Sequence, residues 1–112
     1  MSSRNIYLRF ANLVNAMNKD AGVDLDGIEM KLLEAITEAY TASTPLKVTD
    51  ALGLDLASPA TLHKKIDSLK ALGFVQIEHP EDTKRTKLLV PTEQALGHLD
   101  ALGKALLKAV KK

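Results

Sequence analysis

The N-terminal part of the chain places apolar residues with the period of an α-helix. One face of residues 4–19 carries apolar side chains at the positions i, i+4, i+7, i+8 and i+11, namely Ile6, Phe10, Leu13, Val14 and Met17. This spacing predicts a first helix over about 4–19. The segment 21–24, which reads Ala-Gly-Val-Asp, ends that helix.

A second helix is predicted over about 27–41. Asp26 followed three residues later by Glu29 forms an acidic version of a capping box. A common apolar face follows, made by Ile28, Leu32, Leu33, Ile36 and Tyr40. The stretch 42–45 is a loop, and Thr49 is then expected to cap a short third helix that Gly53 helps to end.

The fourth helix, over 58–72, has the clearest local signals. Ser58 supplies an oxygen to the free amides of the first turn, and Pro59 has the φ angle of a first helical residue. A buried stripe follows at Leu62, Ile66, Leu69 and Leu72. Gly73 can adopt the left-handed conformation that often ends a helix.

The C-terminal half continues with a hairpin and a last helix. Residues 74–79 and 86–90 are rich in strand-forming side chains, and a polar loop joins them. Thr92 is placed to cap a helix whose apolar side consists of Leu96, Leu99, Leu102, Leu106 and Val110. The expected fold is therefore mainly α with a small β-hairpin (α+β), with the helices packed around one core.

Composition places this arrangement in one soluble domain. The chain has 112 residues, of which 46% are hydrophobic and 26% charged, so a single ordinary core is feasible. It contains no cysteine, which excludes disulfides and thiolate metal sites. No secretory signal is visible at residues 1–5, and no apolar run approaches the roughly 18 residues that a membrane span needs. We expect a cytoplasmic protein that does not contact membranes.

Charge is distributed unevenly about Ser58. Residues 1–57 carry a net charge of −3 and residues 58–112 a net charge of +4, within an overall charge of +1. A basic half is typical of a surface that binds phosphates. Four of its lysines lie at the far C-terminus, where they can instead complement a helix end: Lys104, Lys108, Lys111 and Lys112.

Catalysis is not predicted. The three histidines, His63, His79 and His98, fall on different elements and lack the spacing of metal ligands. The carboxylates near the hairpin tip lack the burial that shifts a pKa towards acid–base work. No phosphate-binding glycine loop or nucleophile elbow is present. We expect no metal and no cofactor.

The fourth helix and the hairpin carry the residues suited to DNA. With the apolar stripe turned inwards, helical spacing leaves Ala60, Thr61, Lys64, Lys65 and Ser68 on the opposite or flanking faces. These could meet base edges or phosphates in a groove, and Ser58 with its neighbouring amides suits a phosphate. Lys84, Arg85 and Lys87 would follow the DNA backbone from the hairpin. The same lysines and arginine could equally form an ordinary solvated surface.

The residues also resemble a known family. Residues 58–75 look like the recognition helix and wing entry of MarR-like winged helix-turn-helix regulators, and residues 85–93 look like the wing's return strand and the start of the next helix. The resemblance covers about 45–97 and implies a recognition helix at 58–72 in the major groove, a wing at 80–87, and Arg85 in the minor groove. The wing has one residue more between Asp82 and Arg85 than is usual in the family. Most winged helices share the turn at 72–75, so other winged-helix families stay open.

Two flanking segments suggest an assembly. Residues 1–22 and 92–112 carry apolar faces beyond what a core at 26–91 requires, which predicts a homodimer with recognition helices about 34–36 Å apart on double-stranded DNA. The family often senses small aromatic ligands, but this chain is short for the family and has only four aromatic residues, so no effector is predicted. Two other roles stay open, namely a protein-interaction or assembly module and a DNA-binding component of replication or partition machinery.

Overall fold

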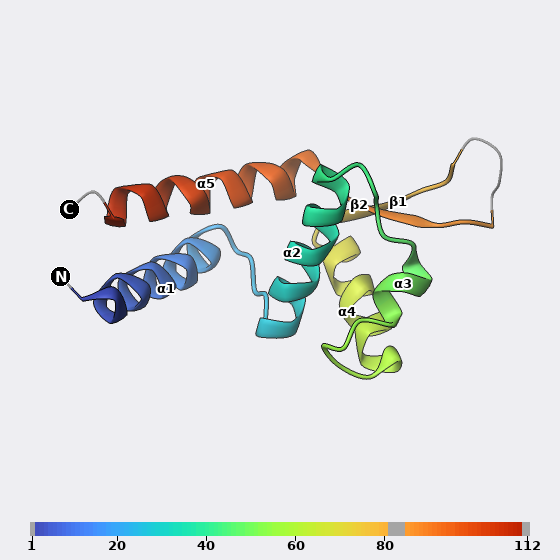
Figure 1. The fold of residues 1–112 in the computed structure, drawn as a ribbon, viewed down its shortest axis with the longest axis horizontal. Helices are drawn as coiled ribbons and strands as arrows, with labels where there is room; N and C mark the ends of the chain where they lie inside the picture. Colours follow the sequence, from blue (N-terminus) through green and yellow to red (C-terminus); the bar gives the residue numbers. More distant parts are fainter. Residues whose placement is uncertain (1, 81–84, 111–112) are drawn as a thin grey trace. The chain divides into compact units, whose positions relative to one another are not determined.

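The computed structural model describes residues 2–80 and 85–110, and over these it shows five helices and a two-stranded hairpin (Figure 1). In chain order they are α1 (Ser3–Asp20), α2 (Gly27–Thr41), α3 (Val48–Leu52), α4 (Pro59–Ala71), β1 (Val75–Glu78), β2 (Leu88–Pro91) and α5 (Glu93–Val110). The element order and the mainly α fold with a small hairpin confirm the sequence prediction.

The chain divides into two compact units. The terminal unit consists of Met1–Asp24 with Gly97–Lys112, and the central unit consists of Leu25–Leu96. The central unit therefore contains α2, α3, α4 and the hairpin, while α1 and most of α5 belong to the terminal unit.

Local capping signals set the ends of the long helices in the central unit. Before α2, the Glu29 N–H donates to Asp26 Oδ1 over 2.7 Å, and the Asp26 N–H donates to Glu29 Oε1 over 3.0 Å. Before α4, the Thr61 N–H donates to Ser58 Oγ over 3.2 Å, and Pro59 is the first helical residue. Past the end of α4, Gly73 has a φ of 78°. These three predicted caps are confirmed.

The predicted cap of α3 is wrong. The helix begins at Val48 with Lys47 as its N-cap, and the Asp50 carboxylate accepts the Lys47 N–H over 3.2 Å, so Thr49 already lies inside the first turn. The cause is a contact distant in sequence. The Val48 N–H donates to the Lys87 carbonyl over 2.9 Å, which fixes the start of the helix beside the hairpin. Gly53 follows the helix as its C-cap, as predicted.

The core of the central unit is closed to solvent. Its largest fully buried side chains come from α2, α4 and the hairpin with its entry, namely Leu32, Leu33, Ile36, Leu62, Leu69, Phe74, Leu89 and Val90. Full burial of such a side chain contributes about 1.5–3 kcal/mol. This core holds the inner face of α4 against α2, which leaves the opposite face of α4 for solvent.

The hairpin is joined to the end of α4 and to the start of α5. Strands β1 and β2 pair antiparallel, with Val75 opposite Pro91. Thr92 then donates its hydroxyl to the Gly73 carbonyl over 2.6 Å and accepts the Ala95 N–H over 3.1 Å. Thr92 is thus the predicted cap of α5, and the same hydroxyl also ties that cap to the end of α4.

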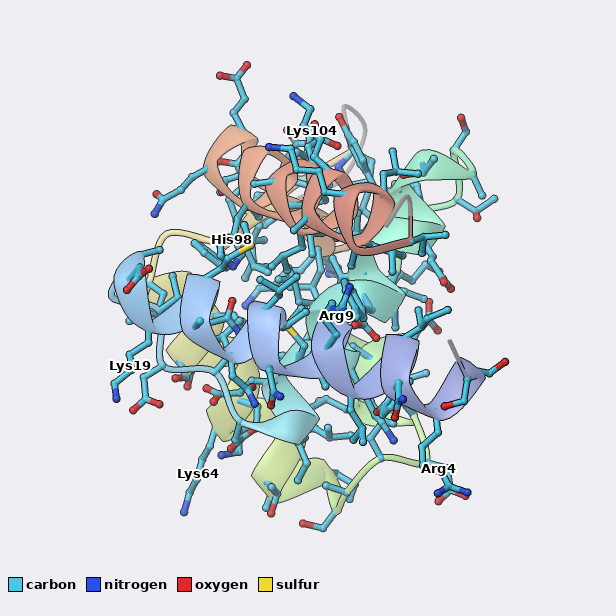
Figure 2. The ribbon with its side chains drawn as sticks, turned by 90° about the vertical axis from the view of Figure 1, so that its left-hand side faces the viewer. Arg4, Arg9, Lys19, Lys64, His98 and Lys104 are labelled. Carbon is cyan, nitrogen blue, oxygen red and sulfur yellow. The ribbon has the colours of Figure 1, made fainter. Side chains whose placement is uncertain are left out.

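The terminal unit pairs α1 with α5. The two helices run antiparallel and side by side (Figures 1 and 2). His98 projects from α5 towards α1, and its Nε2 lies 2.6 Å from Oδ1 of the buried Asn18. Large apolar side chains of both helices stay in solvent, with exposures of 67% for Tyr7, 51% for Leu8, 61% for Leu107 and 55% for Val110. The described part of this unit therefore has an apolar surface that its own two helices do not cover.

Candidate nucleic-acid interface

The outward face of α4 presents short and basic side chains. Ala60 and Lys64 are exposed, whereas Thr61 and Ser68 are half-buried at the edges of the face. Lys64 points away from the protein (Figure 2). Because the buried Leu62 lies on the inner side, the helix cannot turn about its axis without exposing its core residue. Packing therefore fixes which side of α4 faces the solvent.

The first turn of α4 is organised around Ser58. Its exposed Oγ accepts the Thr61 N–H and also lies 3.0 Å from Thr61 Oγ1, to which it donates. These two contacts occupy the serine hydroxyl within the helix cap. Ser58 can still stand close to a phosphate, since a helix N-terminus favours anions, but its hydroxyl proton is already committed to Thr61.

Lys65 differs from Lys64 in its surroundings. It is half-buried, and its Nζ forms an ion pair and hydrogen bond with Asp26 at the start of α2. The hydrogen bond from Lys65, together with the backbone N–H of Glu29, lowers the pKa of the Asp26 carboxyl, and the same hydrogen bond raises the pKa of Lys65. Lys65 therefore connects the middle of α4 to the N-terminus of α2, and Asp26 balances its charge.

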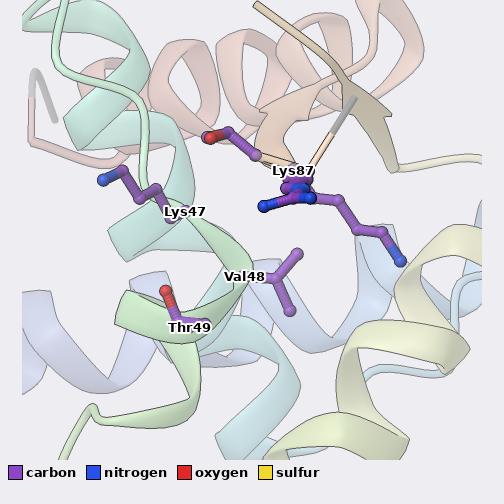
Figure 3. Close-up of a pocket in the computed structure, with 6 residues that line it drawn as sticks. Lys47, Val48, Thr49 and Lys87 are labelled. Atoms are coloured by element: carbon purple, nitrogen blue, oxygen red, sulfur yellow. The ribbon is translucent and has the colours of Figure 1, made fainter. Parts of the chain in front are cut away.

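The base of the wing forms a basic pocket with a segment that the sequence did not connect to it. The pocket measures about 340 Å³ and is lined by Lys47, Val48, Thr49, Arg85, Thr86 and Lys87 (Figure 3). Arg85 and Lys87 were predicted to contact DNA, and both are exposed here. Lys84 lies outside the described residues. Lys47 belongs to the acidic half of the sequence, and only a long-range pairing brings it to this site.

That pairing is a single antiparallel bridge between Lys47 and Leu88. It is held by the bond from Val48 to Lys87 and by a second from the Leu89 N–H to the Leu46 carbonyl, 2.8 Å long. No sequence pattern indicated a strand at 46–48, because a bridge of this length shows no alternation of its own.

His63 and Asp67 on α4 were not predicted to belong to the outward face of the helix. His63 and Asp67 lie one helical turn apart, both exposed, with His63 Nδ1 3.4 Å from Asp67 Oδ2. Asp67 follows Lys64 by three residues, which is almost one helical turn, so it places a negative charge near the basic face. His63 was considered only as a chance histidine, and no spacing rule identifies it as a contact.

Neither a metal-binding cluster nor a membrane-spanning helix is found in the part of the chain that the structure describes. Over residues 2–80 and 85–110, no group of three or more His, Asp or Glu side chains lies close enough to hold a metal ion. Within the same residues, no helix has the length and the apolar character needed to cross a bilayer.

Comparison with known proteins identifies the fold. No protein-family model and no curated protein matches the sequence. Among solved structures, a transcriptional regulator from Thermotoga maritima aligns with a TM-score of 0.71 at 14% identity, covering 96% of this chain and 72% of its own. A MarR-like transcriptional regulator from the same organism aligns at 0.63 with 21% identity, covering 98% and 81%. The heme sensor protein PefR from Streptococcus agalactiae, in complex with heme, aligns at 0.60 with 18% identity, covering 93% and 72%.

These alignments cover nearly the whole chain, including α1 and α5 as well as the central unit. The similarity therefore extends past the part of the sequence that carried the resemblance. Two of the proteins that share the architecture are described as transcriptional regulators. The chain has the winged helix-turn-helix fold of the MarR-like transcriptional regulators.

Proposed function

We propose that this protein is a homodimeric, sequence-specific regulator that binds double-stranded DNA, with α4 in the major groove and the wing on the backbone or in the minor groove. The observation that carries the proposal is the outer face of α4, where Ala60 and Lys64 stand exposed on a helix fixed from behind by a closed core. Solved structures that align with this chain include transcriptional regulators, which favours a role at DNA over other uses of a winged helix.

The roles of the individual side chains follow from their positions. Ala60 and Thr61 lie in the first turn, the part of a recognition helix that usually contacts base edges, and Lys64 reaches outwards one turn later. A lysine there can contact guanine O6 and N7 or a phosphate. Lys65 is held by Asp26, so its first role is to position α4, with Ser68 at the edge of the same face.

Dimerisation is the second part of the proposal. Tyr7, Leu8, Leu107 and Val110 expose apolar surface on the terminal unit, and burial of such surface drives association. A twofold axis would present two copies of α4 to successive major grooves about 34–36 Å apart. A regulator that binds DNA must share a compartment with it, and the cytoplasmic location expected from the sequence would provide this.

Equilibrium binding to a duplex recovered from a random-sequence pool tests the proposal. We expect Lys64→Ala to weaken binding about 5- to 150-fold if it makes a base contact worth about 1–3 kcal/mol, and to relax the sequence preference at one position. Lys70→Ala is the matched control, because Lys70 is exposed in the last turn of the same helix. Equal affinities for the wild type and both variants would contradict the assignment, and no retention of any duplex would favour the protein-interaction role.

A further inference from the structure

The wing-base pocket gathers positive charge from two distant parts of the chain. Lys47 enters from the segment before α3, and Arg85 and Lys87 enter from the segment before β2. Among the residues that the structure describes, no carboxylate lies within ion-pairing distance of the ammonium group of Lys47 or Lys87. The Asp50 carboxylate, the nearest acidic group along the chain, accepts the Lys47 backbone N–H. The pocket is therefore a concave, positively charged surface.

The two sides of the pocket are held together by backbone hydrogen bonds. The bridge between Lys47 and Leu88 fixes the separation of the two segments, because the bonds on either side of it measure 2.9 and 2.8 Å. Two threonines, Thr49 and Thr86, add hydroxyl groups to the lining. Charges and hydroxyls on a paired backbone are the groups that proteins use to contact phosphate oxygens.

The direction of the lysines indicates the shape of the ligand. Figure 3 shows Lys47 and Lys87 on opposite sides of the pocket, with their ammonium ends directed away from each other. A single small anion would be bound best by cations that converge on one point. Cations that diverge from a shared concave surface suit a chain of phosphates that passes between them.

We propose that this pocket binds the sugar–phosphate backbone of DNA, with Lys47 and Lys87 contacting separate phosphates and Thr49 lying against the strand between them. The proposal rests on the DNA-binding function above and adds Lys47 and Thr49 to the residues that carry it. The pocket belongs to the same unit as α4, and α3, which begins at the pocket, packs against α4. A strand held here would therefore fix the register of the duplex relative to the recognition helix without reading its sequence.

The test is the salt dependence of binding to the same duplex for Lys47→Gln, Lys87→Gln and the double variant. Each lost phosphate contact should reduce the slope of log K against log salt by about 0.9, and the double variant should lose about twice that. Affinity at ~0.15 M salt should fall roughly two- to fivefold per lysine, by the same factor for preferred and unrelated sequences. The control is Lys31→Gln, since Lys31 is exposed on α2 and does not line the pocket.

The outcomes separate this inference from the proposed function. If the wild type binds duplex and Lys64→Ala weakens it, but both pocket variants keep the wild-type slope, the backbone site is wrong and the DNA-binding function stands. If the wild type retains no duplex, the function itself is wrong. Titration with inorganic phosphate, followed by backbone NMR, tests a small-anion ligand. Saturable shifts confined to 47–49 and 85–87 that are lost in Lys47→Gln, together with a wild-type salt slope in both pocket variants, would overturn the proposal that the pocket holds an extended strand.

Discussion

The two units of this protein use apolar residues in opposite ways. In the central unit the large side chains of α2, α4 and the hairpin are fully buried, as Leu32, Leu62 and Phe74 show. In the terminal unit, α1 and α5 leave Tyr7 and Leu107 more than half exposed. A closed core stabilises a fold by itself, whereas an open apolar face gains its free energy only when a partner covers it. Under the proposed function, the central unit would hold α4 rigid against DNA and the terminal unit would join two copies of the chain.

The largest effect should come from the closed core. Phe74→Ala is expected to cost about 3–5 kcal/mol, because it removes a fully buried ring whose cavity the neighbours fill only in part. Chemical denaturation would measure this loss. A core defect should destabilise the protein to the same extent at every protein concentration, so a loss that disappears on concentrating the sample would contradict the division into two units.

The second largest effect should come from placing a charge on the exposed apolar face of the terminal unit. Leu107→Glu is expected to weaken the dimer at least about 100-fold, because an unpaired carboxylate in an apolar interface costs several kcal/mol. Sedimentation equilibrium at micromolar concentration checks this, and Leu107→Met is the control, since it keeps apolar volume. The dimer proposal fails if the wild type sediments as a monomer, or if the glutamate variant remains a dimer.

A smaller effect is expected at the joint between α4 and α5. Thr92→Val keeps the shape of the side chain but removes two hydrogen bonds. These are the bond that the hydroxyl donates to the Gly73 carbonyl and the bond that it accepts from the Ala95 N–H. The loss should be about 1–2 kcal/mol in thermal or denaturant unfolding. Thr92→Ser keeps the hydroxyl and should recover most of the stability. Equal losses for valine and serine would show that the hydroxyl contributes little.

The smallest effect concerns the ion pair that connects α4 to α2. The pKa of Asp26 is lowered by Lys65, so its stabilisation is present above the unfolded value of about 3.9 and is lost as the pH falls through the lowered pKa. The pKa of Lys65 is raised, so its contribution is present below the unfolded value and is lost as the pH rises through the raised pKa.

Asp26→Asn removes the carboxylate charge that pairs with Lys65, while asparagine still caps a helix about as well as aspartate does. The variant should unfold at a slightly lower temperature than the wild type at pH 7, and the difference should shrink in 1 M salt and as the pH falls through the lowered pKa of Asp26. A difference that stays constant across pH and salt would assign the effect to the cap rather than to the ion pair.

The helix caps that depend on neighbouring residues could be predicted from the sequence. The caps at Asp26, Ser58 and Thr92 and the left-handed Gly73 were all read correctly, because each depends on residues three or four positions apart or on one backbone angle. The outward face of α4 followed from helical periodicity alone.

Contacts between distant residues could not be read in this way. Lys65 lies 39 positions from Asp26, and Lys47 lies 41 positions from its bridge partner Leu88, so no local pattern links either pair. The first of these partners gives Lys65 a positioning role. The bridge between Lys47 and Leu88 sets the start of α3 at Val48 and brings Lys47 into the basic pocket. The charge count along the sequence did not indicate this, because Lys47 belongs to the acidic half.

Selection of bound duplexes from a random pool at ~0.15 M salt tests most directly whether the terminal unit joins two DNA-reading units. The proposal predicts a twofold-symmetric motif whose half-sites are centred about 10 base pairs apart, one for each α4 of the dimer. Enrichment of a single, asymmetric half-site would contradict the dimeric arrangement, and recovery of no duplex above background would contradict DNA binding itself.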